Sequence, residues 1–210
     1  MTSNSANQMD WEHDQQPPLT AHGSVLQTGI SNGKIAIWLF LASEVMFFTG
    51  LIGAYIVLRF QQGEWPRPEQ TLNVPLTALN TFILICSSVT LVWALQSIQA
   101  GNRARGNLGL LLTTLIGAAF VCIQVVEYIE LYVHRGLRPD TIIFGSCFYT
   151  MTGFHGAHVA VGVIALAILT IMGWCGKFGP RNYATVELTG LYWHFVDLVW
   201  IILFAIVYLM

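Results

Sequence analysis

Charged residues are scarce in this sequence. Asp, Glu, Lys and Arg make up only 10% of its 210 residues, whereas hydrophobic residues make up 55%, and the mean hydropathy is +0.61. A soluble domain needs more charge than this to cover its surface, so a water-soluble globular protein is excluded. The formal net charge of −2 provides no basic surface for nucleic acid, and we expect no nucleic-acid partner.

Paired cysteine motifs are also missing. The four cysteines (Cys86, Cys122, Cys147 and Cys175) share no CxxC spacing, and the first three lie inside apolar runs. This pattern excludes a disulfide framework and a zinc site, and it predicts small buried apolar residues instead.

Residues 1–33 contain no Lys or Arg and no apolar core of a secretory signal, so we expect the first membrane helix to direct insertion. They are rich in Asn, Gln, Ser, Pro and Gly, with acidic residues at Asp10, Glu12 and Asp14. Such a composition buries too little apolar area to fold alone, which predicts a flexible polar N-terminal tail. The alternative is a tail that becomes ordered against a partner subunit.

Long apolar runs dominate the rest of the chain, residues 34–210. There are five of them, at about residues 34–60, 75–98, 108–133, 142–172 and 186–209. Each reaches the roughly 20 residues that cross a hydrocarbon core of about 30 Å, and Gly, Pro and Arg residues mark the breaks between them. The sequence therefore predicts an all-α integral membrane bundle of five transmembrane helices. The Lys and Arg residues divide five to four between its two sides, so charge alone does not decide the orientation.

Acidic residues inside these runs are the strongest functional signal, because a charge at the bilayer centre is costly. Glu44 lies ten residues after Lys34, about 15 Å along a helix that rises 1.5 Å per residue. We expect its carboxyl to be mostly protonated unless a donor or a water molecule holds it. Asp197 lies similarly deep in the last run.

Further polar groups recur at helical spacing. In the third run, Gln124, Glu127 and Tyr128 are spaced to share one face. In the fourth run, His155 and His158 lie one turn apart. The simpler interpretation of these two histidines is a set of hydrogen bonds between helices.

In the last run, Glu187, His194 and Asp197 are predicted to lie on one stripe, flanked by Trp193 and Trp200. His194 and Asp197 are spaced to bond each other. The acids nearest the helix ends (Glu127, Glu130 and Glu187) are most simply solvated carboxylates.

A haem or copper site is a weaker interpretation of the intramembrane histidines. Two imidazoles from facing helices can bind haem, and His155 or His158 could face His194. Cytochromes built on four helices carry pairs of histidine ligands for their haems, and three intramembrane histidines are few for such a site. We therefore predict no metal and no catalytic centre in this chain, while a b-type cytochrome stays an alternative that a Soret band would reveal.

Four segments resemble subunit III of the haem-copper terminal oxidases. Residues 39–50 (LFLASEVMFFTG) resemble its glutamate-bearing helix, and residues 124–128 (QVVEY) resemble its next polar helix. Residues 148–159 (FYTMTGFHGAHV) are similar to its FxxxTGFHGxHV segment, and residues 187–200 (ELTGLYWHFVDLVW) to its terminal WHFVDxVW helix. The resemblance covers residues 34–210 and aligns the chain with the last five helices of seven-helix members.

The resemblance implies a non-redox accessory subunit of a proton-pumping respiratory oxidase in a bacterial plasma membrane. Haem and copper are then expected in partner subunits, with subunit I as the main contact and subunit II beside it. The chain is expected to stabilise subunit I, bind structural phospholipid and support proton uptake, with a cytoplasmic N-terminus and a periplasmic C-terminus. Glu44 would be the intramembrane carboxyl, and the residues of the polar seam and helix contacts would be Gln124, Glu127, Tyr128, His155, His158, Glu187, Trp193 and His194, together with Asp197.

Other functions stay open on the sequence alone. The electron donor is expected to be cytochrome c, with a quinol oxidase or the subunit associated with nitric oxide reductase as close variants. A stand-alone proton channel or transporter would use Glu44, Asp197 and the histidines as a relay. Transporters usually show inverted repeats or broken helices, and we find no such pattern in the sequence.

Overall fold

The computed structural model describes residues 32–62, 65–66, 71–140 and 142–209. Five long helices account for most of these residues: α1 (Asn32–Gln61), α3 (Val74–Gln99), α4 (Arg103–Val133), α5 (Ile143–Trp174) and α6 (Ala184–Phe204), which continues as a π-helix, η1 (Ala205–Leu209). Each span is long and apolar enough to cross a membrane, with a mean hydropathy of 1.9 to 2.2. The predicted all-α bundle of five transmembrane helices is confirmed. The predicted tail lies outside the described residues, except for Asn32 and Gly33, which begin α1.

Two of the helices begin at an asparagine cap, and three end just before a glycine. Asn73 and Asn102 lie just before α3 and α4, and each side-chain oxygen accepts a bond from a backbone N–H in the first turn, as N-cap residues do. Gly101, Gly136 and Gly176 follow the ends of α3, α4 and α5 with φ of 80°, 65° and 74°. Only glycine adopts this left-handed conformation without strain, so it reverses the chain at these points.

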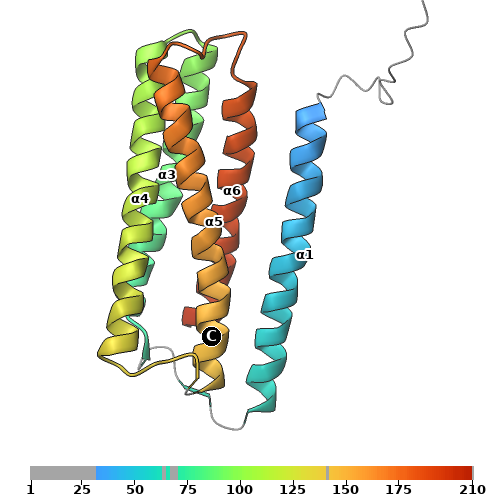
Figure 1. Cartoon of the computed structure of the whole chain (residues 1–210), viewed down its shortest axis with the longest axis vertical. Coiled ribbons are helices and arrows are strands. Elements are labelled where there is room, and N and C mark those ends of the chain that lie inside the picture. The colour runs from blue at the N-terminus through green and yellow to red at the C-terminus, as the bar shows by residue number, and fades with distance from the viewer. Residues whose placement is uncertain (1–31, 63–64, 67–70, 141, 210) are drawn as a thin grey trace, which may run out of the picture. The chain divides into compact units, whose positions relative to one another are not determined.

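Helices α3, α4, α5 and α6 pack in a ring, and α1 contacts α5 and α6 from outside it (Figure 1). The ring closes around fully buried aromatic residues, above all Trp193 and Trp200 of α6, each 1% exposed. Glycines provide the space for Trp193. A Cβ at Gly117 would lie 2.5 Å from its ring, and one at Gly162 would lie 2.8 Å away. The core therefore depends on small residues that let the helices approach closely, as in other membrane bundles.

Helix α1 is held differently. Its buried residues are Leu41, Phe48 and Tyr55, seven residues apart, which places them on one narrow stripe. Only 11% of the most apolar stretch of α1 is buried, compared with 33% to 44% of the corresponding stretch in the other helices. Most of its apolar side chains therefore face outward.

Candidate functional site

A carboxyl–imidazole pair joins α1 to α5 inside the membrane span. Glu44 Oε2 lies 3.0 Å from His158 Nε2, and the two side chains are 17% and 20% exposed. The other ring nitrogen, Nδ1, lies 2.7 Å from the backbone oxygen of Phe154. A carbonyl oxygen only accepts, so Nδ1 must carry a proton in this geometry.

Because His158 Nδ1 carries a proton, the Glu44–His158 hydrogen bond allows two protonation states. Either an imidazolium donates to a Glu44 carboxylate, or a Glu44 carboxylic acid donates to a neutral imidazole. Each has one proton in the bond and no net charge, which suits a site surrounded by hydrocarbon. The sequence analysis expected a protonated Glu44 unless a donor holds it, and His158 is such a partner.

Aromatic residues and a tyrosine support this pair. The Phe48 ring lies 5.2 Å from the His158 ring, and Phe47 lies 6.4 Å from it on the same helix as Glu44. The Tyr192 hydroxyl of α6 donates to the backbone oxygen of His158 at 3.0 Å. All three helices that meet at this point, α1, α5 and α6, therefore contribute to the position of the imidazole.

The neighbouring histidine has a different environment. His155 is fully buried and stacks on Trp200 with the ring centroids 4.8 Å apart. Neither of its ring nitrogens has a hydrogen-bond partner among the described residues. His158 therefore binds a carboxyl of α1, whereas His155 stacks on a tryptophan of α6. The Phe48 ring of α1 lies near both imidazoles.

The acids of α6 do not share one network. Glu187 pairs with Lys34 of α1 at 2.8 Å. Asp197 is buried and accepts a hydrogen bond from Ser88 of α3 at 2.7 Å. The spacing in the sequence allowed His194 to bond Asp197, but among the described residues the hydrogen-bond donor to Asp197 is the Ser88 hydroxyl. The predicted stripe thus connects α6 to two different helices.

The three side chains predicted to share one polar face of α4 contact different helices. Gln124 Nε2 donates to the backbone oxygen of Thr152 at 3.2 Å, and the Tyr128 hydroxyl donates to the Thr152 hydroxyl at 2.6 Å. Both bonds fasten α4 to α5. Glu127 points elsewhere, toward α3 and η1, because a step of one residue turns a helix by about 100°.

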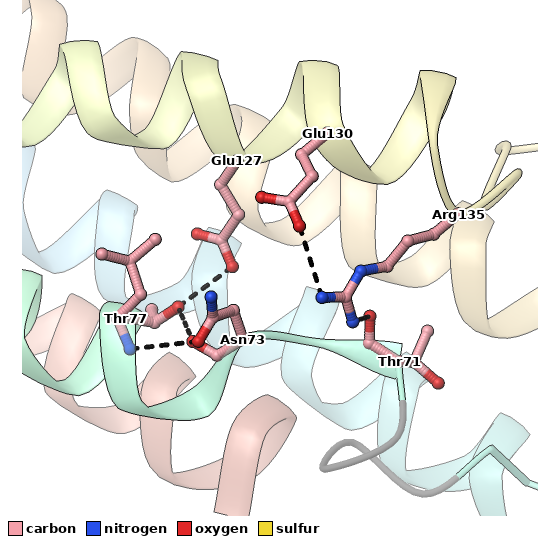
Figure 2. Close-up of polar contacts among 7 residues, drawn as sticks. Thr71, Asn73, Thr77, Glu127, Glu130 and Arg135 are labelled. Carbon is pink, nitrogen blue, oxygen red and sulfur yellow. Dashed lines mark hydrogen bonds and ion pairs between the residues drawn. The ribbon is translucent and has the colours of Figure 1, made fainter.

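Glu127 is buried, 4% exposed, and is not the solvated carboxylate expected from its place near a helix end. Its Oε1 accepts from the Thr77 hydroxyl at 3.0 Å, as Figure 2 shows, and from the Tyr208 hydroxyl at 3.2 Å. The π-helix at the end of the chain places Tyr208 beside this carboxyl. Two hydroxyl donors satisfy an acid that would otherwise be costly to bury.

Glu130, one turn further along α4, does lie at the surface. Arg135 binds Glu130 Oε1 at 3.3 Å and the backbone oxygen of Thr71 at 2.9 Å (Figure 2). This arginine fastens the end of α4 to the segment before α3.

The sequence analysis assigned no role to α3, yet α3 supplies hydroxyl partners to the buried groups. Trp200 Nε1 donates to Thr81 and Trp193 Nε1 donates to Ser87, each at 2.9 Å. Thr77, Thr81 and Ser88 recur at i, i+4 and i+11, which is one helix face. This spacing was visible in the sequence, but hydroxyl residues are too common in membrane helices to single out alone.

The cysteines are not buried as predicted. Cys122 and Cys175 are exposed, Cys86 and Cys147 are intermediate, and all four are free thiols. Cys147 is partly buried against the core, and Cys175 lies just after the end of α5. In the part of the chain that the structure describes, no three His, Cys, Asp or Glu side chains lie together as metal ligands would.

The fold and these pairs define a multi-pass membrane protein whose intramembrane polar groups join helices to one another. Comparison with known proteins identifies the family. The family described as cytochrome c oxidase subunit III matches residues 6–210. This chain belongs to that family. The match takes in residues 6–33, which lie before the motifs noted above.

Cytochrome c oxidase subunits from bacteria and from the rat are similar to this chain in sequence. Cytochrome c oxidase subunit 3 of Bacillus sp. (strain PS3) is 36% identical over 181 residues, which covers 85% of this chain and 86% of that protein. A probable cytochrome c oxidase subunit 3 of Nocardia farcinica is 41% identical over 180 residues, covering 85% and 87%. The rat protein is 36% identical over 196 residues, covering 89% of this chain and 72% of the relative.

Proposed function

We propose that this chain is an accessory subunit of a proton-pumping terminal oxidase that passes electrons from cytochrome c to oxygen. Haem and copper are held by the partner subunits I and II, and this chain packs mainly against subunit I. Its family membership and the names of its relatives, all cytochrome c oxidase subunits, support the assignment. They also favour cytochrome c over quinol as the donor, and oxygen over nitric oxide as the acceptor.

The observation that carries the proposal is the Glu44–His158 pair. It places a carboxyl and an imidazole within hydrogen-bond distance inside the membrane span, and it joins α1 to α5. We assign the pair a positioning role that supports proton uptake and the integrity of subunit I. The remaining polar contacts, including Gln124, Tyr128 and Glu127, hold the bundle in shape.

The outer face of α1 is where we propose that structural phospholipid and subunit I lie. Met46, Phe60 and Trp38 are 77%, 80% and 61% exposed on this helix. Large apolar side chains at this exposure within a membrane span require either lipid or protein against them.

We propose that the N-terminus is cytoplasmic, the C-terminus lies outside, and the membrane is the plasma membrane. The resemblance to subunit III supports this orientation. The Lys and Arg residues divide five to four between the two ends of the bundle, so the positive-inside rule does not decide between the two orientations.

The stand-alone channel has less support. The buried polar groups form separate pairs: Glu44 with His158, Asp197 with Ser88, and Glu127 with Thr77 and Tyr208. A proton relay needs consecutive groups within hydrogen-bond reach of one another.

Isolation of the complex in mild detergent tests the proposal directly. The chain should co-purify with haem- and copper-bearing subunits that reduce oxygen with cytochrome c. Glu44→Gln should leave the complex assembled and should lower its proton uptake and the number of turnovers before inactivation. A colourless preparation of the chain alone that passes protons in liposomes would contradict the assignment.

An apolar carbodiimide tests the position of Glu44. Because Glu44 is reachable from the lipid side while Glu127 and Asp197 are buried, the reagent should label Glu44 first. The modified peptide, found by mass spectrometry, should be absent in Glu44→Gln. Rapid labelling of Asp197 or Glu127 with Glu44 untouched would refute this placement.

A further inference from the structure

The end of helix α6 is fastened to a buried acid of α4. At Ala205 the helix changes into the π-helix η1, which runs to Leu209. Single π-helical turns are rare and frequently mark functional sites. Tyr208 of η1 is 2% exposed, and its hydroxyl donates to Glu127 Oε1 at 3.2 Å. The position of η1 therefore depends on a carboxyl that is itself only 4% exposed.

Two hydroxyl groups donate to the same oxygen of this acid. Thr77 of α3 donates to Glu127 Oε1 at 3.0 Å, beside the bond from Tyr208. An ionised carboxylate has acceptor sites only, and hydrogen bonds to a charged acceptor are roughly twice as strong as neutral ones. The two donors thus stabilise the charge of Glu127, whereas burial opposes it. Because these effects act in opposite directions, both charge states are available to this side chain.

The Thr77 hydroxyl has a second acceptor within reach. It lies 3.1 Å from the backbone oxygen of Asn73, as well as 3.0 Å from Glu127 Oε1 (Figure 2). A hydroxyl donates one proton, so a rotation of this group moves its hydrogen bond from one acceptor to the other. Thr77 therefore keeps a bond when Glu127 is protonated, and the main loss falls on the bond that holds Tyr208.

An open pocket brings water close to this group. It has a volume of about 550 Å³, and its lining includes Asn73 before α3 and Arg135 after the end of α4. Asn73 also provides the second acceptor of Thr77, so Thr77 is one hydrogen bond away from a residue of the pocket wall. A change of pH on this side of the membrane therefore acts within a short distance of Glu127.

The other titratable or charged groups nearby leave Glu127 as the group that controls η1. These groups, from α4, α5, η1 and the loop after α4, are Tyr128, Glu130, Arg135, Tyr149 and Tyr208. Glu130 and Arg135 pair with each other at 3.3 Å, so their charges largely offset one another. Tyrosines are neutral at physiological pH because a phenol ionises only at about pH 10. Helix α3 contains no Asp, Glu, His, Tyr, Lys or Arg.

We propose that Glu127 is a proton-dependent clasp for the end of α6. As a carboxylate it holds Tyr208 and keeps η1 in place, and when it is protonated from the side where α4 ends it releases them. The order of η1 is therefore present at neutral pH and is lost as the pH falls. The clasp involves neither lipid nor proton uptake, and it depends neither on the Glu44–His158 pair nor on the oxidase assignment.

Hydrogen exchange in the intact complex tests the clasp. The exchange of residues 203–209 is followed by mass spectrometry from mildly alkaline to mildly acidic pH and is corrected for the intrinsic effect of pH on amide exchange. Glu127→Gln removes the charge but keeps the size of the side chain and an acceptor oxygen. The matched control is Glu130→Gln, which changes the acid one turn further along α4 at the surface. Tyr208→Phe removes the hydroxyl and leaves Glu127 intact.

We expect exchange of this segment in the wild type to accelerate roughly fivefold on acidification, which corresponds to replacing a hydrogen bond to a charged acceptor by one to a neutral acceptor. Glu127→Gln and Tyr208→Phe should exchange rapidly at every pH, whereas Glu130→Gln should keep the pH dependence of the wild type. If Glu127→Gln does not assemble, Tyr208→Phe gives the same test.

Infrared difference spectra identify the titrating group independently. Acidification should produce the C=O band of a buried carboxylic acid, and this band should be missing in Glu127→Gln but present in Glu130→Gln and in Tyr208→Phe. A role of Glu127 in packing alone would produce neither this band nor any pH dependence of exchange. The clasp would be overturned by pH-independent exchange in the wild type, by a pH dependence retained in Glu127→Gln or Tyr208→Phe, or by its loss in Glu130→Gln.

Discussion

Helix α1 and the four-helix ring of α3 to α6 are held by different forces. The ring is closed by aromatic side chains packed against glycines, with Trp193 seated between Gly117 and Gly162. Helix α1 contributes one buried stripe and two polar links, Lys34–Glu187 and Glu44–His158. The ring combines close packing with several hydrogen bonds between its helices, whereas α1 is packed along one stripe and depends more on its two polar links.

Overpacking the ring should produce the largest effect. Gly117→Ala places a Cβ 2.5 Å from the Trp193 ring, and that ring cannot move freely because its Nε1 bonds Ser87. We expect a loss of about 1–3 kcal/mol. Thermal unfolding of the purified protein in detergent measures it.

The control for this change is on α1. Gly53→Ala meets nothing within 4 Å and should leave stability unchanged or slightly higher, because alanine favours helix more than glycine does. Equal destabilisation by both substitutions would show that the ring is not more tightly packed than α1.

Breaking the intramembrane pair should loosen α1 selectively. We expect Glu44→Ala and His158→Ala each to cost about 1 kcal/mol, which is in the upper range for polar contacts between membrane helices. The double variant should cost little more than either single one, since both remove the same bond. Hydrogen exchange should accelerate in α1 and not in α3 or α4. If the stability losses of the two single variants added fully in the double variant, the bond between Glu44 and His158 would be refuted.

A single hydrogen bond within the ring should matter less than its packing. Thr81→Val removes the hydroxyl that accepts from Trp200 Nε1 and keeps a side chain of similar size, so the packing around Trp200 changes little. We expect a loss of about 0.6 kcal/mol, measured in the same thermal assay. A loss as large as that of Gly117→Ala would mean that hydrogen bonds, and not shape, dominate the ring.

The smallest effect is expected at the exposed end of α1. Lys34→Gln breaks the ion pair with Glu187, but exposed ion pairs contribute little and are screened by salt. Stability should change within the error of the thermal assay, and the small difference should vanish at high salt. A salt-insensitive loss would show that this link is buried in the assembled complex.

The sequence analysis predicted the five helices well because each carries its own signal. A run of apolar residues long enough to cross the membrane, bounded by Gly, Pro and Arg residues, is a local property. Predicting the partners of the polar side chains was less successful. Glu127 was expected in solvent and is buried against Thr77 and Tyr208, and Asp197 bonds Ser88 of α3 and not His194.

The sequence by itself determined the membrane class, the number of spans and the family motifs, because hydrophobic length and helical spacing are encoded locally. Only the tertiary structure decided that Glu44 meets His158, that His155 stacks on Trp200, and that Glu127 is covered by the π-helix. Residues more than 40 positions apart meet through the packing of whole helices. The depth of a side chain follows from its own helix, but its partner depends on how a neighbouring helix is rotated and shifted against it.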